Sequence, residues 1–219
     1  AIDHHTQSLA IDREVGNRRG EGISLNNLGN AYNDLGRYEE AIDHFTQALV
    51  IAREVGDRGG EGNSLGNLGN AYDSLGRYEE AIEHYTQALA ILREVGNRQG
   101  EGMVLNNLAV AHIHLGQCEQ AAERYREAVA VYAALRANAP DDDATQISIF
   151  DEQSKAHDGL VRSLAALGRT DEALCAAEDG RALALARQLG GPEAEAAWSV
   201  ERTRALAAGL GADLVYYHH

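Results

Sequence analysis

The chain has 219 residues, a formal charge of −15 and only two cysteines. This length allows one solenoid or two small domains, and an acidic surface without a run of Lys or Arg disfavours nucleic acid and anionic lipid as partners. The cysteines have no motif spacing, which disfavours a disulfide framework and favours a reducing, cytoplasmic setting, and no apolar run is long enough to span a membrane.

Residues 1–16 return with few changes at 41–56 and at 81–96. The chain therefore opens on the second helix of a repeating unit, and we expect the first helix of that unit to be missing. Each copy ends in glycine, the residue that most readily adopts the left-handed conformation after a helix. A short loop then leads to Glu-Gly and the next helix.

The offset between copies is 40 residues throughout. Segment 23–32 reappears at 63–72, and Leu35-Gly-Arg-Tyr-Glu-Glu-Ala-Ile42 reappears unchanged at 75–82. A fixed period in this range is typical of stacked supersecondary units, none of which can bury its apolar face alone.

Each unit has the pattern of two amphipathic helices. The first helix has an apolar face at helical spacing, formed by Leu25, Leu28, Tyr32 and Leu35. Gly36 ends that helix, and acidic residues at Glu39 and Glu40 open a second one at its positive end. The apolar residues of the second helix are Tyr38, Ala41, Ile42, Phe45, Leu49 and Ile51. Small residues at Gly29, Ala41 and Ala48 indicate where the two helices approach closely, so we expect an αα-hairpin repeat.

These residues resemble the tetratricopeptide repeat (TPR) pattern. The first copy has it at Leu25, Leu28-Gly29, Tyr32, Leu35-Gly36, Tyr38, Ala41, Phe45 and Ala48. The second copy matches from Leu65 to Ala88, while the third has Ala109 for the glycine and His112 for the tyrosine. A period of 40 exceeds the usual value of about 34, and TPRs of this kind are similar to those of Pins/LGN-type adaptors, kinesin light chains and bacterial regulators. The resemblance implies an all-α fold, a right-handed TPR superhelix of αα-hairpins, over residues 1–137.

Beyond this array the pattern loosens, and we predict a divergent fourth TPR-like unit at residues 138–190. A proline followed by three aspartates ends one helix and offers caps for the next. Helices are expected over 145–167 and 171–189, joined by a Gly-Arg-Thr-Asp-Glu-Ala turn that repeats the earlier restart signature.

Residues 191–219 are expected to form an irregular C-terminal extension, with a helix over 193–209 and a strand-like tail at 213–217. Together with the helix around Ala176–Ala184, this part resembles the junction ahead of a CHAT domain. That resemblance implies a caspase-like protease domain beginning here, with its catalytic residues further downstream in a longer protein.

The candidate catalytic and metal-binding residues favour a structural role. His4, His44 and His84 recur in register, but equivalent residues of stacked units lie on the order of 10 Å apart, too far to share one metal ion. His114 and Cys118 flank a turn, yet a nucleophile also needs an orienting group and an oxyanion site. No phosphate loop, zinc-protease motif or dinucleotide fingerprint is present. The sequence therefore predicts no enzyme, no cofactor and no metal.

In TPR solenoids the first helix of each unit lines a concave groove. Mapping by period predicts a peptide-binding face made of Asn26, Asn30, Asn33, Asn63, Asn70, Asp73, Met103, Asn106, Val110 and Ile113. Asparagine is disfavoured inside helices, so these residues need a reason. Their amides can bind the backbone of an extended peptide, as donor and as acceptor. The alternative is a solvated face, with Asn27, Asn67 and Asn107 bonding between helices.

The resemblance implies a protein–protein interaction scaffold that binds an extended peptide or partner segment in this groove. Carboxylate-clamp and Pins/LGN-type TPRs carry basic groove residues, but here the sites near the start of each first helix are Ile23, Asn63 and Met103. We therefore expect a neutral to basic ligand, and self-association through the uncovered solenoid ends is a further expectation. The alternatives are the regulatory arm of a bacterial CHAT protease and a purely architectural spacer.

Overall fold

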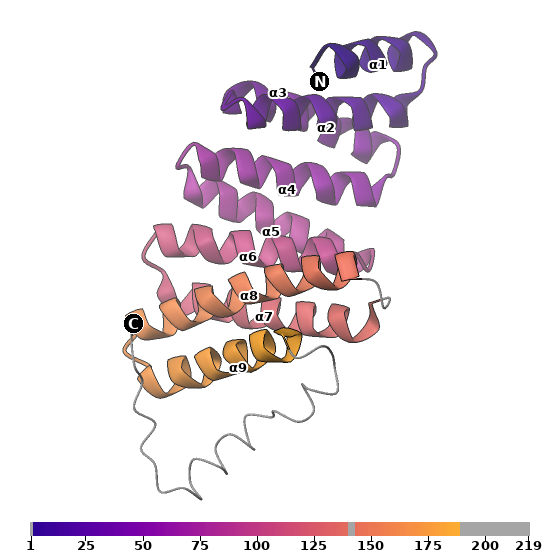
Figure 1. Ribbon diagram of the computed structural model, residues 1–219. Coiled ribbons are helices and arrows are strands. Elements are labelled where there is room, and N and C mark those ends of the chain that lie inside the picture. Colours follow the sequence, from indigo (N-terminus) through magenta and orange to yellow (C-terminus); the bar gives the residue numbers. More distant parts are fainter. Residues whose placement is uncertain (1, 140–142, 189–219) are drawn as a thin grey trace, which may run out of the picture.

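The computed structural model describes residues 2–139 and 143–188, and the regular elements within them are all α-helices. In chain order they are α1 (Ile2–Glu14), α2 (Arg18–Asp34), α3 (Tyr38–Glu54), α4 (Arg58–Ser74), α5 (Tyr78–Glu94), α6 (Arg98–His114), α7 (Cys118–Asn138), α8 (Asp143–Ala166) and α9 (Thr170–Gln188). Each helix packs against its neighbours in the chain, and the hairpins stack in one row from α1 to α9 (Figure 1). The predicted all-α solenoid of αα-hairpins is confirmed.

The first helix of each unit begins earlier than the sequence suggested. Helix α2 starts at Arg18, before the Glu-Gly pair, because the Asn17 side chain accepts a hydrogen bond of 3.1 Å from the Gly20 amide. Asp57 and Asn97 cap α4 and α6 in the same way. Such caps satisfy amide groups that have no partner within the helix, and each typically contributes about 1 kcal/mol.

The core lies between the two helices of each hairpin and continues from unit to unit. Leu25 and Leu28 are fully buried, as predicted. The expectation for Leu35 is wrong, because this side chain is 62% exposed. Helix α2 ends at Asp34, so Leu35 is the C-cap and its side chain leaves the apolar stripe.

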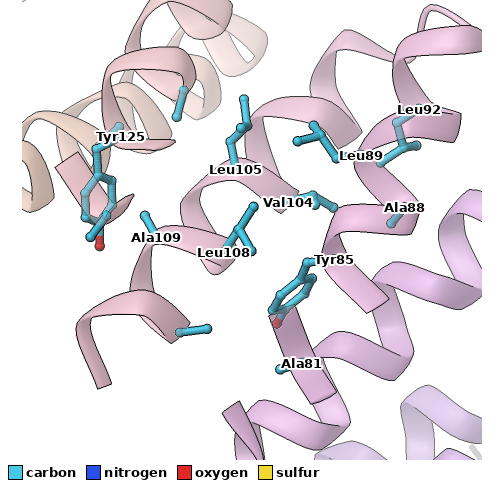
Figure 2. Close-up of a cluster of buried hydrophobic side chains, with 14 of the residues drawn as sticks. Ala81, Tyr85, Ala88, Leu89, Leu92, Val104, Leu105, Leu108, Ala109 and Tyr125 are labelled. Atoms are coloured by element: carbon cyan, nitrogen blue, oxygen red, sulfur yellow. The ribbon is translucent and has the colours of Figure 1, made fainter. Parts of the chain in front are cut away.

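Glycine allows the two helices of a hairpin to approach closely. A Cβ atom at Gly29 would lie 2.4 Å from the Phe45 ring, and one at Gly69 would lie 2.5 Å from the Tyr85 ring. Figure 2 shows Tyr85 among the buried side chains of the next layer, with Leu108 of α6 beside it. Burying an aromatic ring of this kind contributes about 1.5–3 kcal/mol. The predicted close approach at Gly29 is confirmed.

Helices α8 and α9 continue the row beyond α7 (Figure 1). Leu164, Ala173 and Ala176 bury their side chains between them. The boundaries at residues 137 and 190 stay predictions, and the helix and strand expected over 193–209 and 213–217 lie outside the described residues. In the part of the chain that the structure describes, no helix is long and apolar enough to cross a lipid bilayer.

Candidate functional site

A cleft of about 390 Å³ opens on the face formed by α2, α4 and α6, the first helices of three consecutive units. Half of the ten residues predicted to bind a peptide line this cleft, namely Asn26, Asn30, Asn63, Asn70 and Met103. The N-terminal and central parts of the three helices therefore come together around one space. Sequence reasoning also placed Ile23 and Gly66 at this surface, and it missed the contribution of Gly60, Gly62 and Gly100.

Gly66 gives the cleft room in the middle of its length. Helices α2 and α6 carry Asn26 and Asn106 at the same position of the repeat. A Cβ atom at Gly66 would meet only Val104, at an ordinary contact distance of 3.7 Å. On the neighbouring helices Ile23 is 55% exposed and Met103 is 51% exposed, so both offer apolar surface to the same cleft.

Two of the predicted asparagines connect adjacent units. Asn26 donates from Nδ2 to Ser64 Oγ at 2.9 Å. The Oδ1 atom of Asn70 accepts from the Tyr85 hydroxyl at 2.7 Å and from Asn107 Nδ2 at 2.9 Å. These are bonds between helices, as the alternative interpretation of the asparagines expected for Asn107. Sequence reasoning could not assign them, because the partners come from other helices.

Asn30 and Asn63 are different, because both side chains are exposed at the cleft. Within residues 2–139 and 143–188 neither makes a side-chain hydrogen bond. Each amide can therefore donate and accept towards a ligand without breaking a bond of the protein.

The other predicted residues lie away from this cleft. Asn33 and Asp73 each have a buried Oδ1 atom without a partner among the described residues, and burial raises the pKa of Asp73 against the opposing effect of His114. Asn106 is only 8% exposed, and neither of its amide atoms has a partner in the described part of the chain. Val110 and Ile113 are partly exposed on α6. The structure thus separates these five residues from the five that share the cleft.

The tetratricopeptide repeat family model matches residues 1–54, 21–94 and 61–134, which together cover more than half of the chain. The chain belongs to the tetratricopeptide repeat family. No curated protein matches it.

Several solved TPR structures share this fold. Nearly identical TPR-like repeats of the kinesin light chain type from Podosopora anserina superpose with a TM-score of 0.66 at 23% identity, over 86% of this chain and 87% of that one. The apo form of RapI gives 0.64 at 16% identity, over 76% of this chain and 57% of that one. A Rap protein complexed with Competence and Sporulation Factor gives 0.58 at 19% identity, over 83% and 57%. At these identities the likeness shows the fold alone, and the predicted resemblance to kinesin-light-chain repeats is confirmed at that level.

Each of the first three junctions between TPR units contains a buried glutamate that sequence reasoning missed. Glu21 accepts a 2.8 Å hydrogen bond from Arg13 Nε and a second from Arg18. These bonds, led by the one from Arg13, lower the pKa of Glu21 although its burial opposes them. Glu61 is bound in the same way by Arg53 and Arg58, and Glu101 by Arg93 and Arg98. The available signal was the Arg-Glu-Val-Gly segment, followed each time by Arg and then Glu-Gly.

The repeated histidines pack against tyrosines of the same TPR unit. His44 stacks on Tyr32 and His84 on Tyr72, each with ring centroids 5.0 Å apart. Burial lowers the pKa of both histidines. His114 of α6 instead stacks on Tyr78 of α5, in the preceding unit, with centroids 4.4 Å apart. Among the described residues, no three His, Cys, Asp or Glu side chains gather as metal ligands would.

Proposed function

We propose that the chain is a non-catalytic protein-interaction module that binds an extended segment of a partner protein across α2, α4 and α6. The observation that carries this proposal is the cleft of about 390 Å³ shared by three TPR units. Its volume falls within the range typical of ligand sites. TPR-type repeats commonly mediate protein–protein interaction, and a Rap protein of similar fold has been solved with Competence and Sporulation Factor.

The chemistry of the cleft suits an extended chain. Asn30 and Asn63 are exposed amides, which match the alternating donors and acceptors of a peptide backbone. Ile23 and Met103 expose apolar surface that a side chain of the partner can cover. Each Å² of apolar surface removed from water contributes about 25 cal/mol to the free energy of binding. The net charge of −15 favours a neutral to basic partner over an acidic one.

The same site would serve the alternative role of a regulatory arm in a larger bacterial enzyme such as a CHAT protease. In that role the bound segment would control a domain outside this chain. Cys118 and Cys175 form no disulfide with each other within the described residues, which supports a cytoplasmic setting for either role.

The test uses short random peptides displayed on phage and selected against the immobilised chain. Replacing Asn30 and Asn63 with alanine should lower the affinity for the selected peptides about fivefold for each lost hydrogen bond, since such a bond contributes about 1 kcal/mol. The melting temperature should stay the same or rise slightly, because alanine favours helix more than asparagine.

Asn70→Ala is the matched control. This variant loses the bonds to Tyr85 and Asn107, so its melting temperature should fall. The proposal fails if peptides bind the Asn30 and Asn63 double variant as tightly as the parent chain, or if none can be selected that the cleft variants affect.

A further inference from the structure

We propose that the cleft selects an uncharged segment of a partner protein and that an aliphatic side chain of this segment enters the space beside Gly66. This inference rests on the proposed function and specifies the chemistry of the ligand. The net charge alone would favour basic ligands, because an acidic chain attracts them. The proposed ligand class is narrower, since it excludes charged segments of either sign.

The first observation is that none of the described residues that line the cleft is charged. Every residue around it is Asn, Gly, Ile, Leu, Met or Val, although about a quarter of the chain is charged. At the neighbouring junctions, the arginines and glutamates bind one another, as Arg53 and Arg58 do with Glu61. A charged ligand group placed in the cleft would lose water without gaining an opposite charge, which is costly.

The second observation is the shape at Gly66. Asn26 and Asn106 occupy this repeat position on the flanking helices, so α4 alone lacks a side chain there. A Cβ atom there would meet only Val104, at an ordinary contact distance of 3.7 Å, so helix packing does not require a glycine at this position. Glycine inside a helix lowers the stability of that helix relative to alanine. At Gly66 this cost is matched by the room that the missing side chain leaves for a ligand.

The third observation concerns the walls of this space. Ile23 of α2 and Met103 of α6 expose apolar atoms to the same cleft, and the side chain of Val104 forms part of its lining. The nearby Asn70 has its oxygen already occupied by Tyr85 and Asn107. A charged ligand side chain would find no opposite charge among the described residues of the lining, whereas a Leu-like or Met-like side chain would bury apolar surface in the cleft. The exposed amides of Asn30 and Asn63 stay available to the backbone of the ligand.

The experiment compares Gly66→Asn with Gly59→Ala. The first variant restores the residue of the flanking units and fills the space. The second is a control on the same helix, because Gly59 does not line the cleft and a Cβ there meets only Asp57 at 3.6 Å. Both changes should raise the melting temperature, since both remove a helical glycine.

The probes are short random peptides displayed on phage and selected against the chain at low and at high salt. We expect the enriched peptides to share one aliphatic residue with uncharged neighbours, and to bind equally at both salt concentrations. Their affinity for Gly66→Asn should fall about tenfold, and their affinity for Gly59→Ala should be unchanged.

Three results would overturn the inference. In the first, the enriched peptides are rich in Lys or Arg, their affinity falls as salt is added, and they still bind Gly66→Asn. The proposed function would then stand, with a basic ligand in place of an uncharged one. Peptides indifferent to every cleft variant, including the Asn30 and Asn63 pair, would remove both proposals. A chain whose mass in light scattering rises with concentration, and no longer does so in Gly66→Asn, would show that a second copy fills the cleft.

Discussion

Helix α4 has two faces that use glycine for opposite purposes. On the face towards α5, a Cβ atom at Gly69 would lie 2.5 Å from the Tyr85 ring. On the face towards the cleft, a Cβ atom at Gly66 would have Val104 as its nearest side chain, 3.7 Å away. The first glycine brings two helices into contact, and the second leaves room beside them. Residues that hold the solenoid together are thus separable by substitution from residues that shape its binding surface.

The largest effect should come from placing one methyl group on each face. Gly69→Ala forces the Tyr85 ring to move and disturbs its hydrogen bond to Asn70. We expect a loss of about 3 kcal/mol in the free energy of unfolding. Gly66→Ala should instead gain about 0.5–1 kcal/mol, because only helix propensity changes. Urea unfolding of the two variants measures both values, and equal effects would contradict the separation of the faces.

A second, smaller effect concerns the buried glutamate on the packed side of α4. Glu61 is 7% exposed and is bound by Arg53 and Arg58, which are themselves about half exposed. Glu61→Ala should cost about 2 kcal/mol, less than for a fully buried ion pair, because the freed arginines regain water. Peptide binding to the folded variant should not change, since Glu61 does not line the cleft.

The fourth junction supplies the matched control for this prediction. Gln153 of α8 lies as far before Leu167 as Glu61 lies before Leu75, and it is 3% exposed. Its Oε1 atom has no hydrogen-bond partner within the described residues. Gln153→Ala should therefore cost about 1 kcal/mol or less. If urea unfolding gives the same loss for both variants, the arginine pairs add nothing to the regular junctions.

The packed face and the cleft face of the first helices could not be predicted equally well from the sequence. Helix positions and the close approach at Gly29 follow from local residue patterns, which hydrophobic spacing and the period record directly. The exposure of Leu35 was mispredicted, because a spacing rule cannot tell the last helical residue from the cap that follows it. The roles of Asn70 and Asn30 depend on which side chains of other helices reach them, and no single-helix pattern contains that information.

The smallest predicted effect separates the faces by pH. His84 is half buried between α4 and α5 and stacks on Tyr72, and its Nδ1 atom has no partner among the described residues. Burial lowers the pKa of this imidazole below its ordinary value of 6.5, although Glu83 and Glu80 oppose the shift. His44 has the same environment one unit earlier.

Because the folded pKa of these histidines is depressed, the unfolded chain binds more protons as the pH falls below about 6.5. The contribution of these histidines to the free energy of unfolding should therefore be fully present above that pH. It should be lost as the pH falls towards their lower pKa values in the folded state. Among the described residues that line the cleft, none has a titratable side chain, so peptide affinity for the folded chain should stay constant over the same range. Melting temperatures measured between pH 7 and about 5 should decline for the parent chain and decline less for a variant with both histidines replaced by glutamine. A decline of equal size in that variant would assign the effect to other groups. A loss of peptide affinity in chains that remain folded would mean that the stability of the packed face and the binding of the cleft are coupled after all.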